Sequence, residues 1–125
     1  MTQPIRVLIA DDSVRTREGL RALFAAWPEI LVIGEVSNGR EAVSMVAQLL
    51  PDIVLMDLSM PVMGGVQATR LIKQQWPGVT VIVLTMYADQ QAVALAAGAD
   101  AFVIKGSAPE RLLAAMGVDV TSRSL

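Results

Sequence analysis

The sequence predicts an α/β fold with a parallel sheet of five strands. Short apolar runs alternate five times with segments of helical composition, and proline or glycine stands at most of the junctions. Such alternation implies parallel strands joined by right-handed crossovers. Hydrophobic residues make up 54% of the chain but aromatic residues only 4%. The core must therefore be aliphatic, as expected for a parallel sheet covered by helices on both faces.

The predicted strands are short apolar runs, most of which end at a polar residue. They cover residues 5–10, 30–36, 53–56, 79–84 and 101–104.

The predicted helices follow the strands and cover residues 14–27, 41–50, 66–76, 88–97 and 109–116. In the first helix Leu20, Phe24 and Trp27 recur at helical spacing, and Ser13 or Asp12 is placed to cap it. Proline follows the first three helices at positions 28, 51 and 77. Asn38–Gly39 indicates a turn before the second helix, Gly98 a C-cap for the fourth, and Pro109 the start of the last.

Composition excludes several classes of function. There is no cysteine, which excludes disulfides, thiol catalysis and Cys-ligated metals, and no histidine, which excludes His-based triads. The net charge is -2 without a basic run, so this chain alone is a poor electrostatic match for DNA. No apolar stretch approaches the roughly 18 residues of a membrane span, and no signal peptide is evident. We therefore expect a cytoplasmic domain without membrane contact.

Candidate site residues follow four of the five predicted strands. Asp11 and Asp12 follow the first strand, Asp57 the third, Thr85 the fourth and Lys105 the fifth. The carboxyl ends of parallel strands meet at one edge of the sheet, so these side chains should lie together. Clustered carboxylates repel and need a proton or a cation, and Mg²⁺ prefers carboxylate and phosphate oxygens. Each Asp alone could simply cap a helix, and Lys105 alone could be a surface lysine; together they predict a site.

The chemistry that suits these residues is phosphoryl transfer. A carboxylate can attack phosphorus and form an aspartyl-phosphate. The reaction needs positioning and charge neutralisation more than proton transfer, so the lack of histidine is no obstacle. Mg²⁺ and Lys105 would neutralise the phosphoryl group, and Thr85 could donate a hydrogen bond to one of its oxygens.

Taken in order, these motifs resemble the response-regulator receiver family of two-component systems. The matching segments are the acidic pair Asp11–Asp12 and residues 54–58, 60–65, 84–85 and 98–105. The resemblance covers about residues 5–116, so we expect a receiver domain over residues 1–116 and a C-terminal tail over 117–125. It implies a flavodoxin-like (βα)5 sandwich of three layers with strand order 2-1-3-4-5.

The resemblance also implies a phosphoacceptor and a metal site. Asp57 would accept a phosphoryl group from the phosphohistidine of a sensor histidine kinase. Mg²⁺ would be held by Asp12, Asp57 and the main-chain carbonyl of Ser59, with Asp11 helping through water. Such a domain assists its own phosphorylation and dephosphorylation and is not a turnover enzyme.

A switch is implied by the same resemblance. Lys105 would pair with the phosphoryl group, Thr85 would move toward that group, and Phe102 would rotate inward behind it. Phe102 could equally be a plain core aromatic. Ser59 and Tyr87 flank the route of attacking water in the family, so we hypothesise that Tyr87 shields the acyl-phosphate; the alternative is a surface tyrosine beside a loop.

Residues 38–42 and 84–87 resemble the NarL/FixJ (LuxR-type) subgroup, whose receivers usually precede a helix-turn-helix domain. This chain holds no such output domain, so it is either a single-domain regulator or part of a longer one. DNA would be contacted only through that absent domain, which would serve transcription regulation.

Two departures from the family pattern stand out. Gly106 follows Lys105 where many receivers have proline, which leaves the isomer of the Lys105–Gly106 peptide bond open. The segment from Thr85 to Lys105 is about two residues shorter than the family spacing. We therefore expect a shortened fourth helix and an altered output face, which could also mediate a homodimer.

Three alternatives remain from the sequence. A degenerate receiver would only bind partners, although the five polar residues are all present. A flavodoxin-like electron carrier shares the alternation, but Asp11 and Asp12 would repel its cofactor phosphate. A metal-dependent phosphatase would commonly carry a second acid two residues after the nucleophile, where this chain has Ser59.

Overall fold

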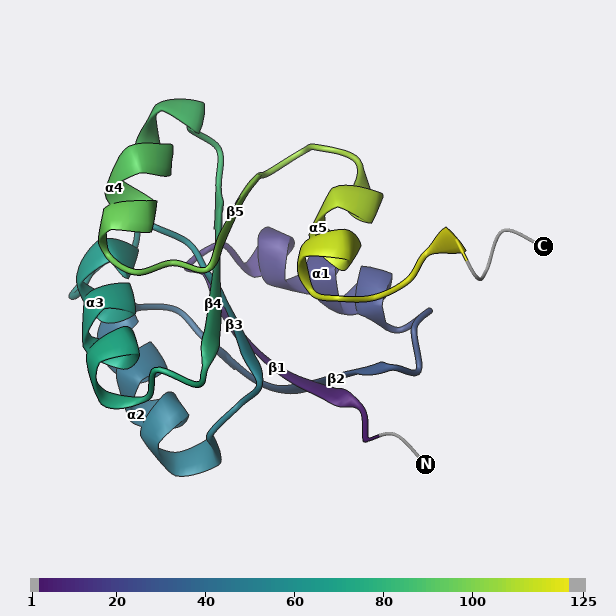
Figure 1. Cartoon of the computed structure of the whole chain (residues 1–125), viewed down its shortest axis with the longest axis horizontal. Coiled ribbons are helices and arrows are strands. Elements are labelled where there is room, and N and C mark those ends of the chain that lie inside the picture. The colour runs from purple at the N-terminus through teal and green to yellow at the C-terminus, as the bar shows by residue number, and fades with distance from the viewer. Residues whose placement is uncertain (1–2, 122–125) are drawn as a thin grey trace.

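The computed structural model describes residues 3–121 and contains one parallel sheet (Figure 1). Its strand order is β2-β1-β3-β4-β5, and every neighbouring pair is parallel. The predicted fold class and strand order are thus confirmed. The strands are β1 (Ile5–Ala10), β2 (Ile30–Val36), β3 (Ile53–Met56), β4 (Thr80–Thr85) and β5 (Ala101–Ile104).

The helices form two layers that cover opposite faces of the sheet. In Figure 1, α1 and α5 lie on one side, and α2, α3 and α4 lie on the other. Their bounds are α1 (Val14–Phe24), α2 (Gly39–Leu49), α3 (Gly65–Gln75), α4 (Gln91–Ala96) and α5 (Pro109–Ala115), with a 3₁₀ turn η1 (Ala88–Gln90) before α4.

The central strands supply both halves of the core because their side chains alternate between the faces. In β1, Val7 and Ile9 pack toward α1 and α5, whereas Leu8 and Ala10 join the residues of α2 and α3. Val7, Leu8 and Ile9 are completely buried. Full burial of such a side chain contributes about 1.5–3 kcal/mol, so this apolar sheet is the main source of stability.

The first helix is shorter than its apolar spacing predicts. It ends at Phe24, and the prediction that it reaches Trp27 is wrong. The Trp27 N–H donates to the Phe24 carbonyl at 2.9 Å in the turn that leads to β2, while its side chain still packs on the core. Helical spacing could not distinguish a helix that reaches Trp27 from a turn after Phe24, because in both arrangements Trp27 packs on the same core as Leu20 and Phe24. Ser13, and not Asp12, is the N-cap: its hydroxyl accepts from the Thr16 N–H at 3.2 Å.

The fourth helix is the shortest of the five. It has six residues, whereas α1, α2 and α3 have 11 each. The predicted helix over 88–97 therefore begins with the 3₁₀ turn η1 and becomes α-helical only at Gln91. As predicted, Gly98 ends it: with φ of +104°, its N–H donates to Leu95 and the next N–H donates to Ala94.

The predicted C-terminal tail begins within the packed unit. After α5 the chain turns at Gly117, and the Val118 N–H donates to the Leu113 carbonyl at 2.9 Å. Val118 is buried in the same core as Leu112, and Val120 packs against it. The core thus extends beyond residue 116.

The loop between β3 and α3 is fixed by a close approach of main chains. The Gly65 N–H donates to the Leu58 carbonyl at 3.0 Å. A Cβ atom added at Gly65 would meet the carbonyl group of Asp57. Only glycine therefore lets α3 begin this close to the end of β3, and this contact sets where Asp57 stands.

The different surroundings of Gly65 and Gly19 predict opposite effects on stability when each is replaced by alanine. Gly65→Ala should lower the free energy of unfolding by about 1–3 kcal/mol, because the methyl group must displace the main chain of Asp57. Gly19→Ala, at an exposed site in α1 with no atom within 4 Å of the added Cβ, should raise it by about 0.5–1 kcal/mol. Urea denaturation of both variants measures the difference. Equal stability of Gly65→Ala and the wild type would contradict this account.

Candidate functional site

Four of the predicted site residues are positioned by the carboxyl edge of the sheet. Asp11 follows β1, Asp57 follows β3, Thr85 is the last residue of β4, and Lys105 follows β5. Two main-chain bonds continue the strand ladders at this edge. The Asp57 N–H donates to Ala10 at 2.9 Å, and the Lys105 N–H donates to Thr85 at 2.7 Å. The sheet itself thus holds the main chains of the site, as the sequence predicts.

Three carboxylates converge at this edge. Asp11, Asp12 and Asp57 each place one carboxylate oxygen within 4.8 Å of the others. Asp11 and Asp57 are only 2% and 6% exposed, whereas Asp12 is exposed. The cluster is therefore buried on the sheet side and open to solvent at Asp12, so ions can reach it.

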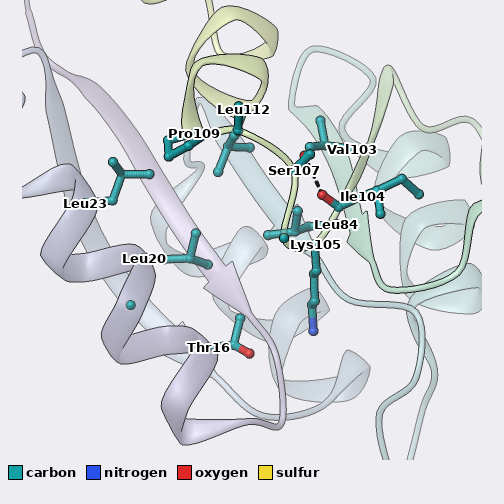
Figure 2. Close-up of a pocket in the computed structure, with 13 residues that line it drawn as sticks. Thr16, Leu20, Leu23, Leu84, Val103, Ile104, Lys105, Ser107, Pro109 and Leu112 are labelled. Carbon is teal, nitrogen blue, oxygen red and sulfur yellow. Dashed lines mark hydrogen bonds between the residues drawn. The ribbon is translucent and has the colours of Figure 1, made fainter.

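Lys105 is the cation of the cluster. Its Nζ lies 2.7 Å from Asp11 Oδ2 and 3.6 Å from Asp57 Oδ1. The stem of the side chain borders an apolar cavity of about 260 Å³ between α1 and α5. Figure 2 shows the ammonium group extending away from Pro109 and Leu112 of that cavity. The packed stem directs the charge toward the acids.

The acids outnumber the cation. Three carboxylates against one ammonium group leave two negative charges when all are ionised. Burial raises the pKa of Asp57, and the carboxylates of Asp11 and then Asp12 raise it further. Lys105 and a main-chain hydrogen bond from Ser59 lower this pKa and only partly offset the rise. A divalent cation with oxygen ligands would balance the remaining charge, so the residues present fit Mg²⁺.

The loop after β1 is held by contacts that sequence reasoning missed. Arg17 Nη1 donates to the main-chain carbonyl of Asp11 at 2.6 Å, and Arg17 Nε pairs with Glu35 at 3.2 Å. The Ser13 N–H donates to Asp11 Oδ1 at 2.9 Å. These contacts fix both oxygens of Asp11 between Ser13 and Lys105. The only sequence signal for Arg17 was a basic residue in the second turn after an acidic pair.

The predicted switch and tuning residues differ in their exposure. Thr85 is 1% exposed, and its hydroxyl donates to Gln90 Oε1 at 2.7 Å. Phe102 is half-buried and packs against the cluster of Leu58, Val83, Ala94 and Ala99, and Tyr87 and Ser59 are exposed. Among residues 3–121 there is no cis peptide bond, so Lys105–Gly106 is trans.

Comparison with known proteins identifies the family. The model of the response regulator receiver domain matches residues 7–117, which is most of the chain. The chain belongs to the response-regulator receiver family.

This receiver is similar to transcriptional regulators and to regulators of known structure. It is 47% identical over 111 residues to YhcZ of Bacillus subtilis, an uncharacterized transcriptional regulatory protein, covering 87% of this chain and 52% of that one. A LuxR-family two-component response regulator from Aurantimonas superposes with a TM-score of 0.86 at 34% identity, covering 92% and 84%. RcsB of Salmonella enterica, solved bound to the promoter rprA with the phosphomimetic BeF3⁻, gives 0.83 at 26% identity, covering 93% and 68%.

These relatives confirm the predicted family and its LuxR-type subgroup. The receiver spans about half the length of the curated relatives it matches. Within residues 3–121, each helix is too short or too polar to cross a bilayer.

The raised pKa of Asp57 predicts that its charge lowers the stability of the metal-free receiver. This cost is absent below the ordinary pKa of Asp and grows as pH rises through the higher pKa of the folded state. In EDTA at neutral pH, Asp57→Asn should therefore melt a few degrees above the wild type, and the gap should close at acidic pH. Thermal unfolding at several pH values measures it.

Adding Mg²⁺ supplies the control for that experiment. The cation should raise the melting temperature of the wild type and have little effect on Asp57→Asn, because one ligand is lost. A variant that melts below the wild type in EDTA, or equal stabilisation of both proteins by Mg²⁺, would contradict the electrostatic account.

Proposed function

We propose that this receiver takes a phosphoryl group on Asp57 from the phosphohistidine of a sensor histidine kinase in the cytoplasm, with Mg²⁺ as cofactor. It would then switch an output that regulates transcription, and it would turn over no substrate of its own. One observation carries the proposal: the buried Asp57 carboxylate lies beside two further acids and within 3.6 Å of a lysine ammonium group.

The proposed transfer is an in-line displacement at phosphorus. An Asp57 carboxylate oxygen forms the new P–O bond while the P–N bond to the kinase imidazole breaks and its electron pair returns to the ring nitrogen. Asp12, Asp57, the Ser59 main-chain carbonyl and, through water, Asp11 would hold Mg²⁺, which neutralises phosphoryl charge when bound. Lys105 would exchange its contact with Asp11 for a phosphoryl oxygen.

Phosphorylation would act as a switch through the contacts it creates. The phosphoryl group adds about 1.5 to 2 negative charges. A shift from 1:99 to 99:1 requires about 5.5 kcal/mol, and one charge-assisted hydrogen bond supplies roughly 1.5–3 kcal/mol. Bonds from both Thr85 and Lys105, together with inward rotation of Phe102, would approach this amount. Phe102 borders a cavity of about 500 Å³ beside α4, which leaves it free on that side.

The face that carries α4 is proposed to be the output face. Val93 and Leu95 of α4 and the adjoining Met86 and Tyr87 are exposed, and α4 itself has no charged residue. A helix that is apolar on its solvent side is typical of an interface. We assign this face to a homodimer, with DNA contacted only through an output domain of the kind its longer relatives would carry.

Acetyl phosphate tests the proposed chemistry directly. With Mg²⁺, the wild type should gain the mass of one phosphoryl group, and Asp57→Asn should gain none, because its amide is not a nucleophile. Intact-mass spectrometry measures both. Asp89→Asn, a change at an exposed acid in η1, should behave as the wild type. Equal phosphorylation of Asp57→Asn, or phosphorylation that survives EDTA, would disprove the assignment.

The exposed Tyr87 should control the lifetime of the phosphorylated form. If its ring shields the acyl-phosphate, Tyr87→Ala should speed hydrolysis several-fold, and Tyr87→Phe should retain the wild-type rate. Decay of the phosphorylated mass after removal of acetyl phosphate measures the lifetime. Met86→Ala removes a neighbouring exposed side chain and serves as the control. An unchanged lifetime in Tyr87→Ala would show that Tyr87 is a surface residue only.

A further inference from the structure

The hydroxyl of Thr85 is bonded away from the acidic cluster. It donates to Gln90 Oε1 at 2.7 Å, a short distance for such a bond. Thr85 is 1% exposed, and Gln90 is half-buried beside it. A buried hydroxyl depends on a protein partner because water cannot replace it. Gln90 is therefore the acceptor that stabilises Thr85 in this arrangement.

This bond excludes the contact that phosphorylation requires. A hydroxyl carries one proton and can donate it to one acceptor at a time. The other contact of the Thr85 oxygen, from the Tyr87 N–H at 3.4 Å, uses a lone pair and leaves the proton with Gln90. Thr85 can thus donate to a phosphoryl oxygen only after its bond to Gln90 has broken.

We propose that Gln90 is a positioning residue that holds Thr85 in the unphosphorylated arrangement and is released on phosphorylation. The inference rests on the proposed function, since it takes Thr85 as a phosphoryl ligand. Gln90 lies outside the phosphoryl site and opposes activation, because it stabilises the unphosphorylated arrangement.

The position of Gln90 connects this release to the output face. Gln90 is the last residue of η1 and the N-cap position of α4, and its own side chain makes no cap bond to that helix. The bond to Thr85 therefore attaches the start of α4 to the end of β4. Since α4 has only six residues, loss of this attachment would affect most of the helix.

The same segment also borders Phe102. Ala88 of η1 and Gln91 of α4 line the cavity of about 500 Å³ into which one side of Phe102 faces. Movement of Gln90 away from Thr85 would change the walls of this cavity. Thr85 and Phe102 are thus connected through one short segment: the Thr85 hydroxyl is bonded to Gln90, and the nearby Ala88 and Gln91 line the cavity beside Phe102.

Binding of beryllofluoride with Mg²⁺ tests the inference by titration calorimetry. Gln90→Leu keeps much of the volume of the side chain but cannot accept the proton of Thr85, so the present arrangement is destabilised. The variant should bind about two- to tenfold more tightly than the wild type, as expected for the loss of one neutral hydrogen bond. Gln74→Leu, the same change at an exposed position of α3 that does not line this cavity, should leave the affinity unchanged.

Repeating Gln90→Leu in a Thr85→Val protein distinguishes loss of the Thr85–Gln90 hydrogen bond from a general effect of the substitution on α4. In Thr85→Val the hydroxyl is absent, so Gln90→Leu should no longer change the affinity for beryllofluoride. Thermal unfolding in EDTA establishes that each variant is folded. Equal gains from Gln90→Leu in both backgrounds, or no gain in the wild-type background, would overturn the role of Gln90.

The outcomes distinguish this inference from the proposed function. If the wild type binds no beryllofluoride, or if Asp57→Asn binds it equally, the proposed function fails and the role of Gln90 fails with it. If the wild type binds and Gln90→Leu binds with the same affinity, only the role of Gln90 is overturned.

Discussion

Repulsion between buried carboxylates is the constraint on which the rest of this receiver depends. Neighbouring strands of a sheet lie about 4.8 Å apart, so acids that follow β1 and β3 cannot avoid one another. Asp11 and Asp57 are both buried there, and Lys105 offsets only part of their charge. The fold keeps this unfavourable arrangement because the apolar sheet beneath it contributes far more stability than the acids remove.

The repulsion between the acids also explains why binding of a cation or addition of a phosphoryl group would strongly affect this site. A cation or a phosphoryl group changes the charge balance at a place where solvent screens it poorly, so its effect on neighbouring groups is large. Lys105 already has two acceptors within reach and can exchange one for another. The supports around the cluster are rigid by contrast: Gly65 fixes the main chain at Asp57, and Arg17 holds the carbonyl of Asp11.

The route from the site to the surface is short. Thr85 ends β4, and its hydroxyl donates a hydrogen bond to Gln90. The residue after Gln90 begins α4. Among the five helices of the described residues, α4 alone has no charged residue, which makes its surface different from the other helical surfaces. A small change in hydrogen bonding at Thr85 therefore has a direct structural path to exposed apolar residues such as Val93 and Leu95.

The sequence by itself determined the succession of strands and helices along the chain, because hydrophobic periodicity locates them. It also determined that Asp11, Asp57, Thr85 and Lys105 lie at one edge, because parallel strands align their ends. The strand order within the sheet came from the family resemblance. The prediction from periodicity failed at Trp27, where a turn and a helix bury the same surface. Only the tertiary structure decided that Lys105 lies closer to Asp11 than to Asp57, that Arg17 holds the loop after β1, and that Thr85 is bonded to Gln90. These contacts depend on rotamers and loop conformations, which are set by packing between segments distant in sequence and leave no periodic signal.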